Sequence, residues 1–143
     1  MRVLPLLLAL LIAAPAAATS DDLRSVAGMR YHNRIVLAFT PTLGDPRLTA
    51  QRQAMARIGL SAAERDLILV QVDRTRVIGA HDKAAKLRQR FHVSESDFRA
   101  LLIGKDGNVA LASPGPIPAR RLIQAIDAMP MRKAERRQAA ARP

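Results

Sequence analysis

Cysteine is absent from all 143 residues of the chain, and this absence excludes several classes of protein at once. Without a thiol, the chain cannot carry out disulfide exchange or thiol peroxidase chemistry, and it cannot offer cysteine ligands to a metal. The chain also lacks the disulfides that stabilise many exported proteins, so its stability must come from its hydrophobic core. Neither a thiol oxidoreductase nor a peroxidase is compatible with this composition.

Aromatic and acidic residues are also scarce. Aromatic residues make up 3% of the chain and tryptophan is missing, so the stacking platform of single-stranded nucleic-acid binders is not available. Twelve acidic residues face 23 lysines and arginines, which gives a formal net charge of +11. This excess favours anionic partners such as lipid head groups or acidic polysaccharides, without selecting one of them, and no specific nucleic acid is expected.

Only the N-terminus carries a long hydrophobic run. Met1-Arg2 precedes an apolar stretch from Val3 to Ala14, and Ala16-Ala17-Ala18 is typical of a signal peptidase site. The stretch is shorter than the ~20 residues that a membrane span needs. We therefore expect a signal peptide over residues 1–18 and an exported mature protein, periplasmic or secreted, without a transmembrane span. The remainder predicts one domain over residues 19–131 and a basic, disordered tail over residues 132–143.

The continuous apolar run at residues 35–39 is typical of a strand buried on both faces of a sheet, and the mostly apolar residues 67–73 predict a second strand of this kind. Between them, Asp45-Pro46 has the chemistry of a helix start, and helical spacing continues to Ile58. A second helix is expected from a cap at Asp82 to about residue 91. Residues 74–81 are predicted to be a loop.

The best-specified local structure is a hairpin around Gly104-Lys105-Asp106-Gly107. Leu101 to Ile103 precede this turn, and Val109 and Leu111 alternate after it. A last helix begins near Pro118 and is ended or kinked by Met129-Pro130-Met131. This order predicts a thioredoxin-like three-layer α/β/α sandwich with a mixed four-stranded sheet, a βαβ half followed by a ββα half.

Four motifs give the chain a family resemblance: Glu64-Arg65-Asp66-Leu67, Leu87-Arg88 with Arg90-Phe91, residues 102–107, and residues 126–132 with Glu135. On these residues the chain resembles the exported domain-of-unknown-function family 4174, whose relatives include domains of animal sushi-repeat-containing extracellular proteins. The resemblance implies a thioredoxin-like fold and brings no known catalytic residues. Basic residues that follow the turn in the family pattern are replaced here by Ala110 and Ala112.

Two groups of residues are candidates for function, and neither has the spacing of a catalytic or metal motif. The three histidines are far apart, so we expect no metal, cofactor or catalytic residue. Methionines adapt to varied apolar partners, and the C-terminal cations attract anions, which together predict a partner surface. The residues of that surface are Met129, Pro130, Met131, Arg132, Lys133, Arg136 and Arg137.

A candidate cleft with Glu64, Asp73 and His81 is the alternative, because ligands of open α/β sheets bind at the carboxyl ends of the strands. The structural interpretation of Glu64 is a local ion pair with its neighbours, and Asp127 is expected to pair with an arginine. We interpret the protein as a non-catalytic binding module for a protein partner or an anionic envelope component. A small cleft enzyme without thiol chemistry, or an electrostatic binder of anionic polymers, remains the alternative.

Overall fold

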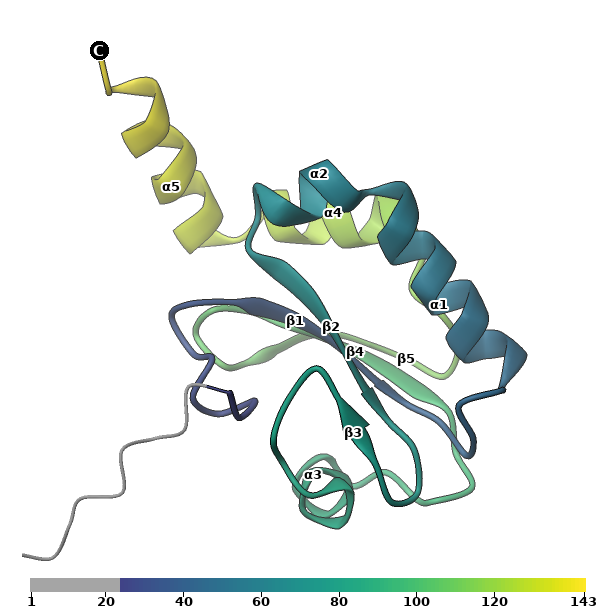
Figure 1. The fold of residues 1–143 in the computed structure, drawn as a ribbon. Helices are drawn as coiled ribbons and strands as arrows, with labels where there is room; N and C mark the ends of the chain where they lie inside the picture. Colours follow the sequence, from purple (N-terminus) through teal and green to yellow (C-terminus); the bar gives the residue numbers. More distant parts are fainter. Residues whose placement is uncertain (1–23) are drawn as a thin grey trace, which may run out of the picture.

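The computed structural model describes residues 24–143, and the predicted signal peptide over residues 1–18 lies outside the described residues. The described part contains five strands and five helices, interspersed along the chain (Figure 1). Their bounds are β1 (Arg34–Phe39), α1 (Pro46–Arg57), α2 (Gly59–Ala63), β2 (Leu67–Val72), β3 (Val77–Ile78), α3 (Ala84–Phe91), β4 (Arg99–Ile103), β5 (Val109–Ser113), α4 (Ala119–Asp127) and α5 (Pro130–Ala140).

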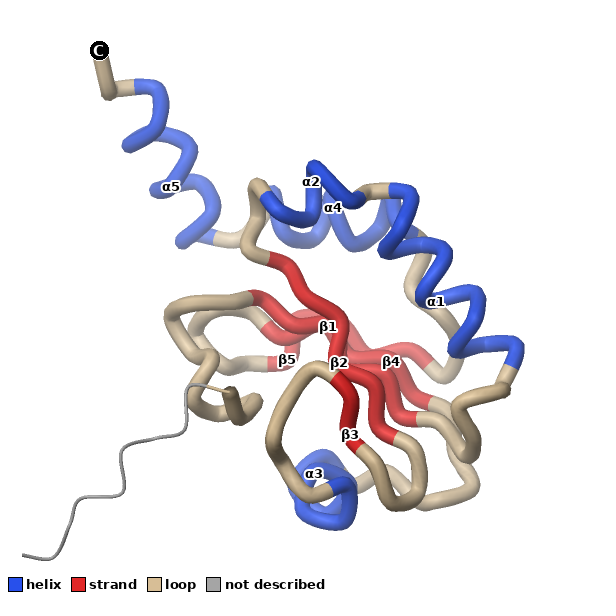
Figure 2. Tube along the Cα trace, viewed as in Figure 1, coloured by secondary structure: helices blue, strands red, loops and turns tan. Residues whose placement is uncertain are grey.

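The strands form a single mixed sheet in the order β3-β2-β1-β4-β5 (Figure 2). β1 lies at the centre and all six of its residues are buried, as the continuous apolar run predicts. It runs parallel to β2 and antiparallel to β4. The βαβ unit and the antiparallel hairpin are therefore confirmed.

A fifth strand corrects the predicted four-stranded sheet. Residues 74–81 were expected to form a loop, but Val77 pairs with Val72 and Ile78 with Gln71, which adds β3 at one edge. The backbone turns back because the Asp73 carboxylate accepts hydrogen bonds from the backbone N–H groups of Thr75 and Arg76. A strand of two residues is too short to show a period, so the sequence pattern gave no sign of it.

Helices cover both faces of the sheet, and alternate residues of β1 point into two separate cores. On one face, Phe39 packs in a core with Leu87 of α3. On the other, Val36 packs in a core with Leu48 of α1 and Leu122 of α4. Figure 1 shows α1, α2 and α4 on one side of the sheet and α3 on the other, so the described domain has three layers.

One predicted helix start is confirmed and one is wrong. Asp45 caps α1, because its carboxylate accepts a hydrogen bond from the backbone N–H of Arg47. Asp82 does not cap α3: its carboxylate accepts from the backbone N–H of Val26, and Lys83 occupies the cap position. A carboxylate near a helix start can thus be recruited by a distant segment, which a local sequence pattern does not reveal.

The hairpin of β4 and β5 contains a bulge. Ile103 pairs with Val109 and Leu102 with Leu111, so Ala110 is an extra residue on β5. In the turn, Gly107 has a φ of 83°, whereas the φ of Asp106 is not positive. The Asp106 carboxylate holds the turn instead, accepting from the backbone and side-chain N–H groups of Asn108.

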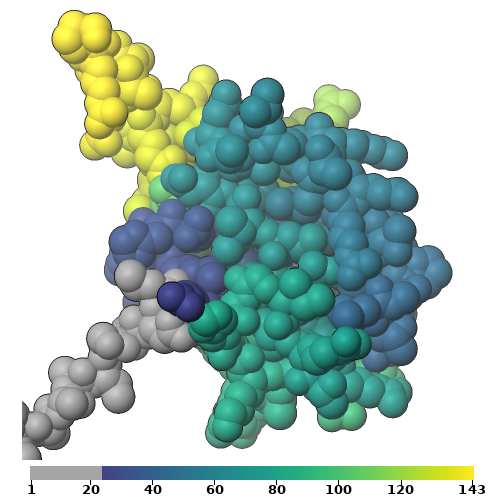
Figure 3. All heavy atoms as spheres, viewed as in Figure 1, coloured from purple at the N-terminus to yellow at the C-terminus, as the bar shows by residue number. Residues whose placement is uncertain are grey.

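The segment Met129-Pro130-Met131 ends α4 and begins α5, with Pro130 in the first turn of the new helix. Residues 132–143 were expected to be a disordered tail, and the structure has a helix there up to Ala140. This helix projects from the body of the domain (Figure 3), and none of its residues is fully buried. No helix in the described residues is long and apolar enough to cross a membrane.

Candidate functional site

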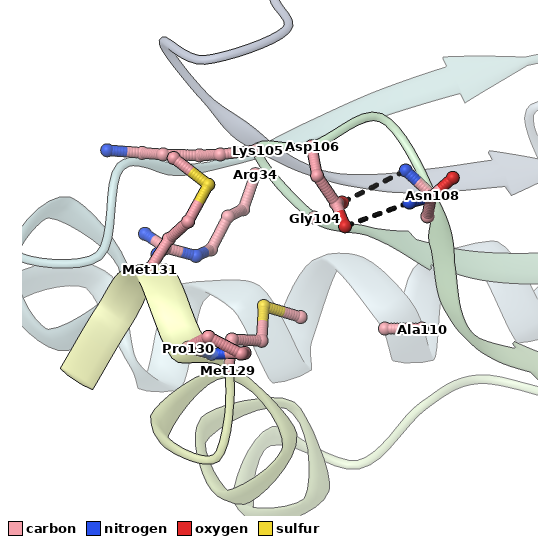
Figure 4. Close-up of a pocket in the computed structure, with 9 residues that line it drawn as sticks. All are labelled: Arg34, Gly104, Lys105, Asp106, Asn108, Ala110, Met129, Pro130 and Met131. Atoms are coloured by element: carbon pink, nitrogen blue, oxygen red, sulfur yellow. Dashed lines mark hydrogen bonds between the residues drawn. The ribbon is translucent and has the colours of Figure 1, made fainter. Parts of the chain in front are cut away.

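A hollow of about 190 Å³ lies between the β4–β5 turn and the junction of α4 with α5 (Figure 4). Met129, Pro130 and Met131 line one side, and the other side is lined by Gly104, Lys105, Asp106, Asn108 and Ala110. Arg34 reaches into it from the start of β1. We call this hollow the methionine groove, and its walls are mostly apolar although two cations, Arg34 and Lys105, stand beside it.

The two methionines differ in how they are held. Met129 packs against the core under α4, and its sulfur lies 3.7 Å from the position that a Cβ on Gly104 would take. Met131 remains 38% exposed. Met129 is therefore part of the packing of the domain, while Met131 is available at the surface.

Four charged side chains beneath the groove form what we call the charge network: Arg34, Asp66, Lys105 and Glu135. The Glu135 carboxylate accepts hydrogen bonds from both terminal nitrogens of Arg34, at 3.1 and 3.3 Å, and lies 2.9 Å from Lys105 Nζ. Lys105 in turn donates to Asp66 at 2.7 Å. The network joins α5 to the start of β1, to the β4–β5 turn and to the residue that precedes β2.

Arg34 is the most unusual member of the charge network, because its side chain is completely buried. Its guanidinium also donates to the backbone carbonyl of Arg65 at 2.8 Å, and its Nε has no hydrogen-bond partner in the described structure. A buried cation requires a compensating charge, and Glu135 supplies it. Burial raises the pKa of Glu135, but hydrogen bonds from Lys105 and Arg34 outweigh this and hold it below the ordinary 4.5.

A second set of contacts joins α4 to the end of α2. The guanidinium of Arg65 donates to both carboxylate oxygens of Asp127, each at 2.9 Å, and this bond lowers the pKa of Asp127. The predicted pairing of Asp127 with an arginine is confirmed. Arg132 of α5 lies beside this pair and donates to the backbone carbonyl of Glu64 at 2.9 Å.

Three further cations of α5 lie at the surface of the helix. Lys133, Arg136 and Arg137 follow helical i, i+3 and i+4 spacing and line one shallow hollow together with Ala140. All three are exposed, and none forms an ion pair within the described residues. We call these three residues the basic face. The single acidic residue of α5, Glu135, is turned inward, so the basic face carries only positive charge.

The structure does not bring the candidate cleft residues together. Glu64 precedes β2 and Asp73 follows it, so the six residues of the strand, roughly 20 Å, separate the two carboxylates. Asp73 closes the turn to β3: burial raises its pKa, but hydrogen bonds from the backbone N–H groups of Arg76 and Thr75 outweigh this and hold the pKa below its ordinary value. Glu64 is 69% exposed and lies 3.5 Å from Arg65, which agrees with the local ion pair. His81 is exposed and follows β3 in the chain.

No group of three or more histidines, aspartates or glutamates gathers as a potential metal site in residues 24–143. At the carboxyl ends of β1 and β2, where the sheet would place a ligand, the space is taken by Arg88. Its side chain is buried, and it donates to the carbonyls of Thr40 and Val72 at 2.8 and 3.4 Å. This arginine ties α3 to the strand ends.

Sequence reasoning missed the two cations of the charge network. Lys105 looked like one residue of a hairpin turn, and Arg34 looked like part of the lead-in to β1. The available signal was a charged residue at the head of an otherwise apolar strand, since a charge in such a position requires a partner. That the partner lies 101 residues away, in α5, is a tertiary fact.

These features define a cysteine-free α/β domain whose mixed five-stranded sheet carries a projecting basic helix, held at its base by ion pairs. Comparison with protein families matches residues 25–135 to DUF4174, a domain of unknown function. The chain belongs to this family. The match includes both partners of every ion pair in the charge network and ends at Glu135. No curated protein matches the chain.

Proposed function

We propose that the protein is an exported, non-catalytic binding module that docks an acidic segment of a partner protein against the methionine groove and the basic face. The observation that carries this proposal is the adjacency of the two surfaces. The groove ends at Met131 in the first turn of α5, and the same helix presents the exposed cations Lys133, Arg136 and Arg137.

The groove is suited to one apolar side chain. Its volume of about 190 Å³ is several times the ~30 Å³ that one water molecule occupies in the liquid. Its walls include flexible methionine side chains, which adjust to the shape of an inserted group. An apolar anchor in the groove would be followed by acidic residues along α5, where three exposed cations attract them.

The fold supports a module of thioredoxin-like type. In the strand order β2-β1-β4-β5, the first pair is parallel and the others are antiparallel, which agrees with a βαβ half followed by a ββα half. α1 and α4 lie on one face and α3 on the other. Export to the periplasm or the medium is proposed from the sequence of residues 1–18.

The enzyme alternative loses its support, because Glu64 and Asp73 lie at opposite ends of β2 and Asp73 is engaged in a turn. The anionic-polymer alternative makes use of the basic face alone. A protein partner uses the groove as well, and this difference separates the two in an experiment.

The test uses a fluorescent peptide with one leucine followed by four glutamates, and a second peptide with alanine in place of leucine. We expect the leucine peptide to bind about tenfold more tightly, because partial burial of the larger side chain contributes about 1.4 kcal/mol. Binding of both should weaken with added salt. Equal binding of the two peptides would show that the groove takes no part and would favour the polymer binder.

Two variants with equal charge change locate the site. Replacing Lys133, Arg136 and Arg137 by glutamate should abolish binding. Replacing Lys83, Lys86 and Arg90 by glutamate, three exposed cations on and beside α3, should weaken it only through the lower net charge. If both triple variants lose binding to the same degree, the basic face is not the docking surface.

A further inference from the structure

β5 is an unprotected edge of the sheet. Within residues 24–143 no strand pairs with its outer side. Its sequence, Val109-Ala110-Leu111-Ala112-Ser113, contains no charge and no proline, two devices that protect an edge from pairing with another chain, so the bulge at Ala110 is the one such device it carries. The opposite edge is protected differently, since β3 has only two residues. The sheet is therefore open to an additional strand on one side.

This free edge is continuous with the methionine groove. Ala110, the extra residue of the β5 bulge, is also part of the groove wall. At the other end of β5, Leu111 to Ser113 line a second hollow of about 190 Å³ together with Ile117, Pro118 and Arg121. An extended segment lying along β5 would thus reach one hollow at each end of the strand.

We propose that the partner segment binds as an additional strand along β5, with its acidic end on the basic face. This inference rests on the proposed function and specifies the conformation of the bound segment. Main-chain hydrogen bonds to β5 would supply affinity, and alternate side chains would face the two hollows. The recognised chemistry is an uncharged, β-prone stretch of four or five residues, then an apolar anchor, then acidic residues.

Charge argues against a second copy of this chain as the occupant. Each chain carries a formal net charge of +11, and pairing β5 with β5 would bring two such chains together. An acidic segment instead brings charge complementary to Lys133, Arg136 and Arg137. An anionic polysaccharide would neutralise the same cations but has no peptide N–H groups to pair with the edge.

The probe is the leucine and glutamate peptide extended at its N-terminus by Val-Thr-Val-Thr. With the extension at this end, the added residues can lie antiparallel to β5 while the leucine stays at the methionine groove, and antiparallel pairing is the slightly more stable kind. The extension should tighten binding about tenfold over the short peptide. Two further versions carry N-methyl groups either on both valines or on both threonines. Because N–H groups of a strand point alternately to opposite sides, only one methylated version should lose the gain, and the other should keep it.

The outcomes separate this inference from the proposed function. If the short peptide binds but the extension adds nothing, or if both methylated versions bind alike, strand addition is refuted and the docking module stands. If even the short leucine peptide fails to bind, both proposals fail.

Hydrogen exchange gives a second, independent measurement. Saturating extended peptide should slow the exchange of outward-facing amides in Val109–Ser113 by at least about tenfold, and the short peptide should leave them unchanged. Protection that appears without peptide and rises with protein concentration would identify a second copy as the occupant and would overturn the proposal of an acidic partner segment.

Discussion

Replacing Glu135 by glutamine tests whether the charge network holds α5 to the domain. The change keeps the shape of the side chain and an acceptor oxygen but removes the charge that compensates Arg34, which is completely buried. Breaking a buried ion pair typically costs 3–5 kcal/mol. Glu135 is 27% exposed, and Arg34 keeps its bond to the Arg65 carbonyl, so we expect a loss of about 2 kcal/mol.

The assay is urea unfolding followed by far-ultraviolet circular dichroism at pH 7 and low salt. Glu64→Gln is the matched control, because the Glu64 carboxylate is mostly exposed and pairs with Arg65 at 3.5 Å. Such a surface pair contributes less than about 1 kcal/mol. Hydrogen exchange of α5 would show in the same variant whether the helix opens before the rest of the domain unfolds.

The pH dependence follows from the same contacts. The pKa of Glu135 is lowered in the folded protein, so its stabilising effect is complete above the ordinary value of 4.5 and is lost as the pH falls through the lower, folded value. The difference between wild type and Glu135→Gln should therefore disappear in strong acid. Equal urea midpoints for the Glu135 and Glu64 variants at pH 7 would refute the reasoning.

Three other substitutions have expected results that thermal or urea unfolding can check. Gly107→Ala should cost about 1–2 kcal/mol because of its φ of 83°, whereas Gly44→Ala, with open space around it, should be nearly neutral. Gln51→Ala should cost about 2–4 kcal/mol, because the buried amide bonds both backbone groups of Ile117; the exposed Gln53→Ala is its control. Asp73→Ala should cost about 1–3 kcal/mol by opening the turn to β3, and unchanged binding of the leucine peptide would confirm that Asp73 is structural.

The parts of the fold that could be predicted are those written in local patterns. β1 and β2 could be predicted because their sequences are almost entirely apolar, and α1 because Asp45 and Pro46 mark its start. β3 was missed because its two residues carry no period. The helical nature of α5 was missed because it has no apolar stripe, and what attaches it is an ion pair between Glu135 and a strand far away in sequence.

For the candidate site too, the local motif could be predicted from the sequence and the long-range contacts could not. Met129 to Met131 drew notice as an unusual local motif, and the structure places them along the groove. Arg34 and Lys105 did not, because their meaning depends on residues that only folding brings near. Glu64 and Asp73 were both candidates for one cleft. Strand β2 lies between them, and residues close in sequence lie far apart when the chain between them is extended.

Tyr31 gives the domain an intrinsic optical probe. It is the one tyrosine of a chain without tryptophan, its ring is 60% exposed, and the Arg30 guanidinium lies 4.8 Å from the ring centre. Its backbone N–H donates to the carbonyl of Lys105, a member of the charge network. Tyrosine fluorescence of the unlabelled protein therefore originates beside Lys105 of the charge network, and a titration can follow that neighbourhood without an introduced dye.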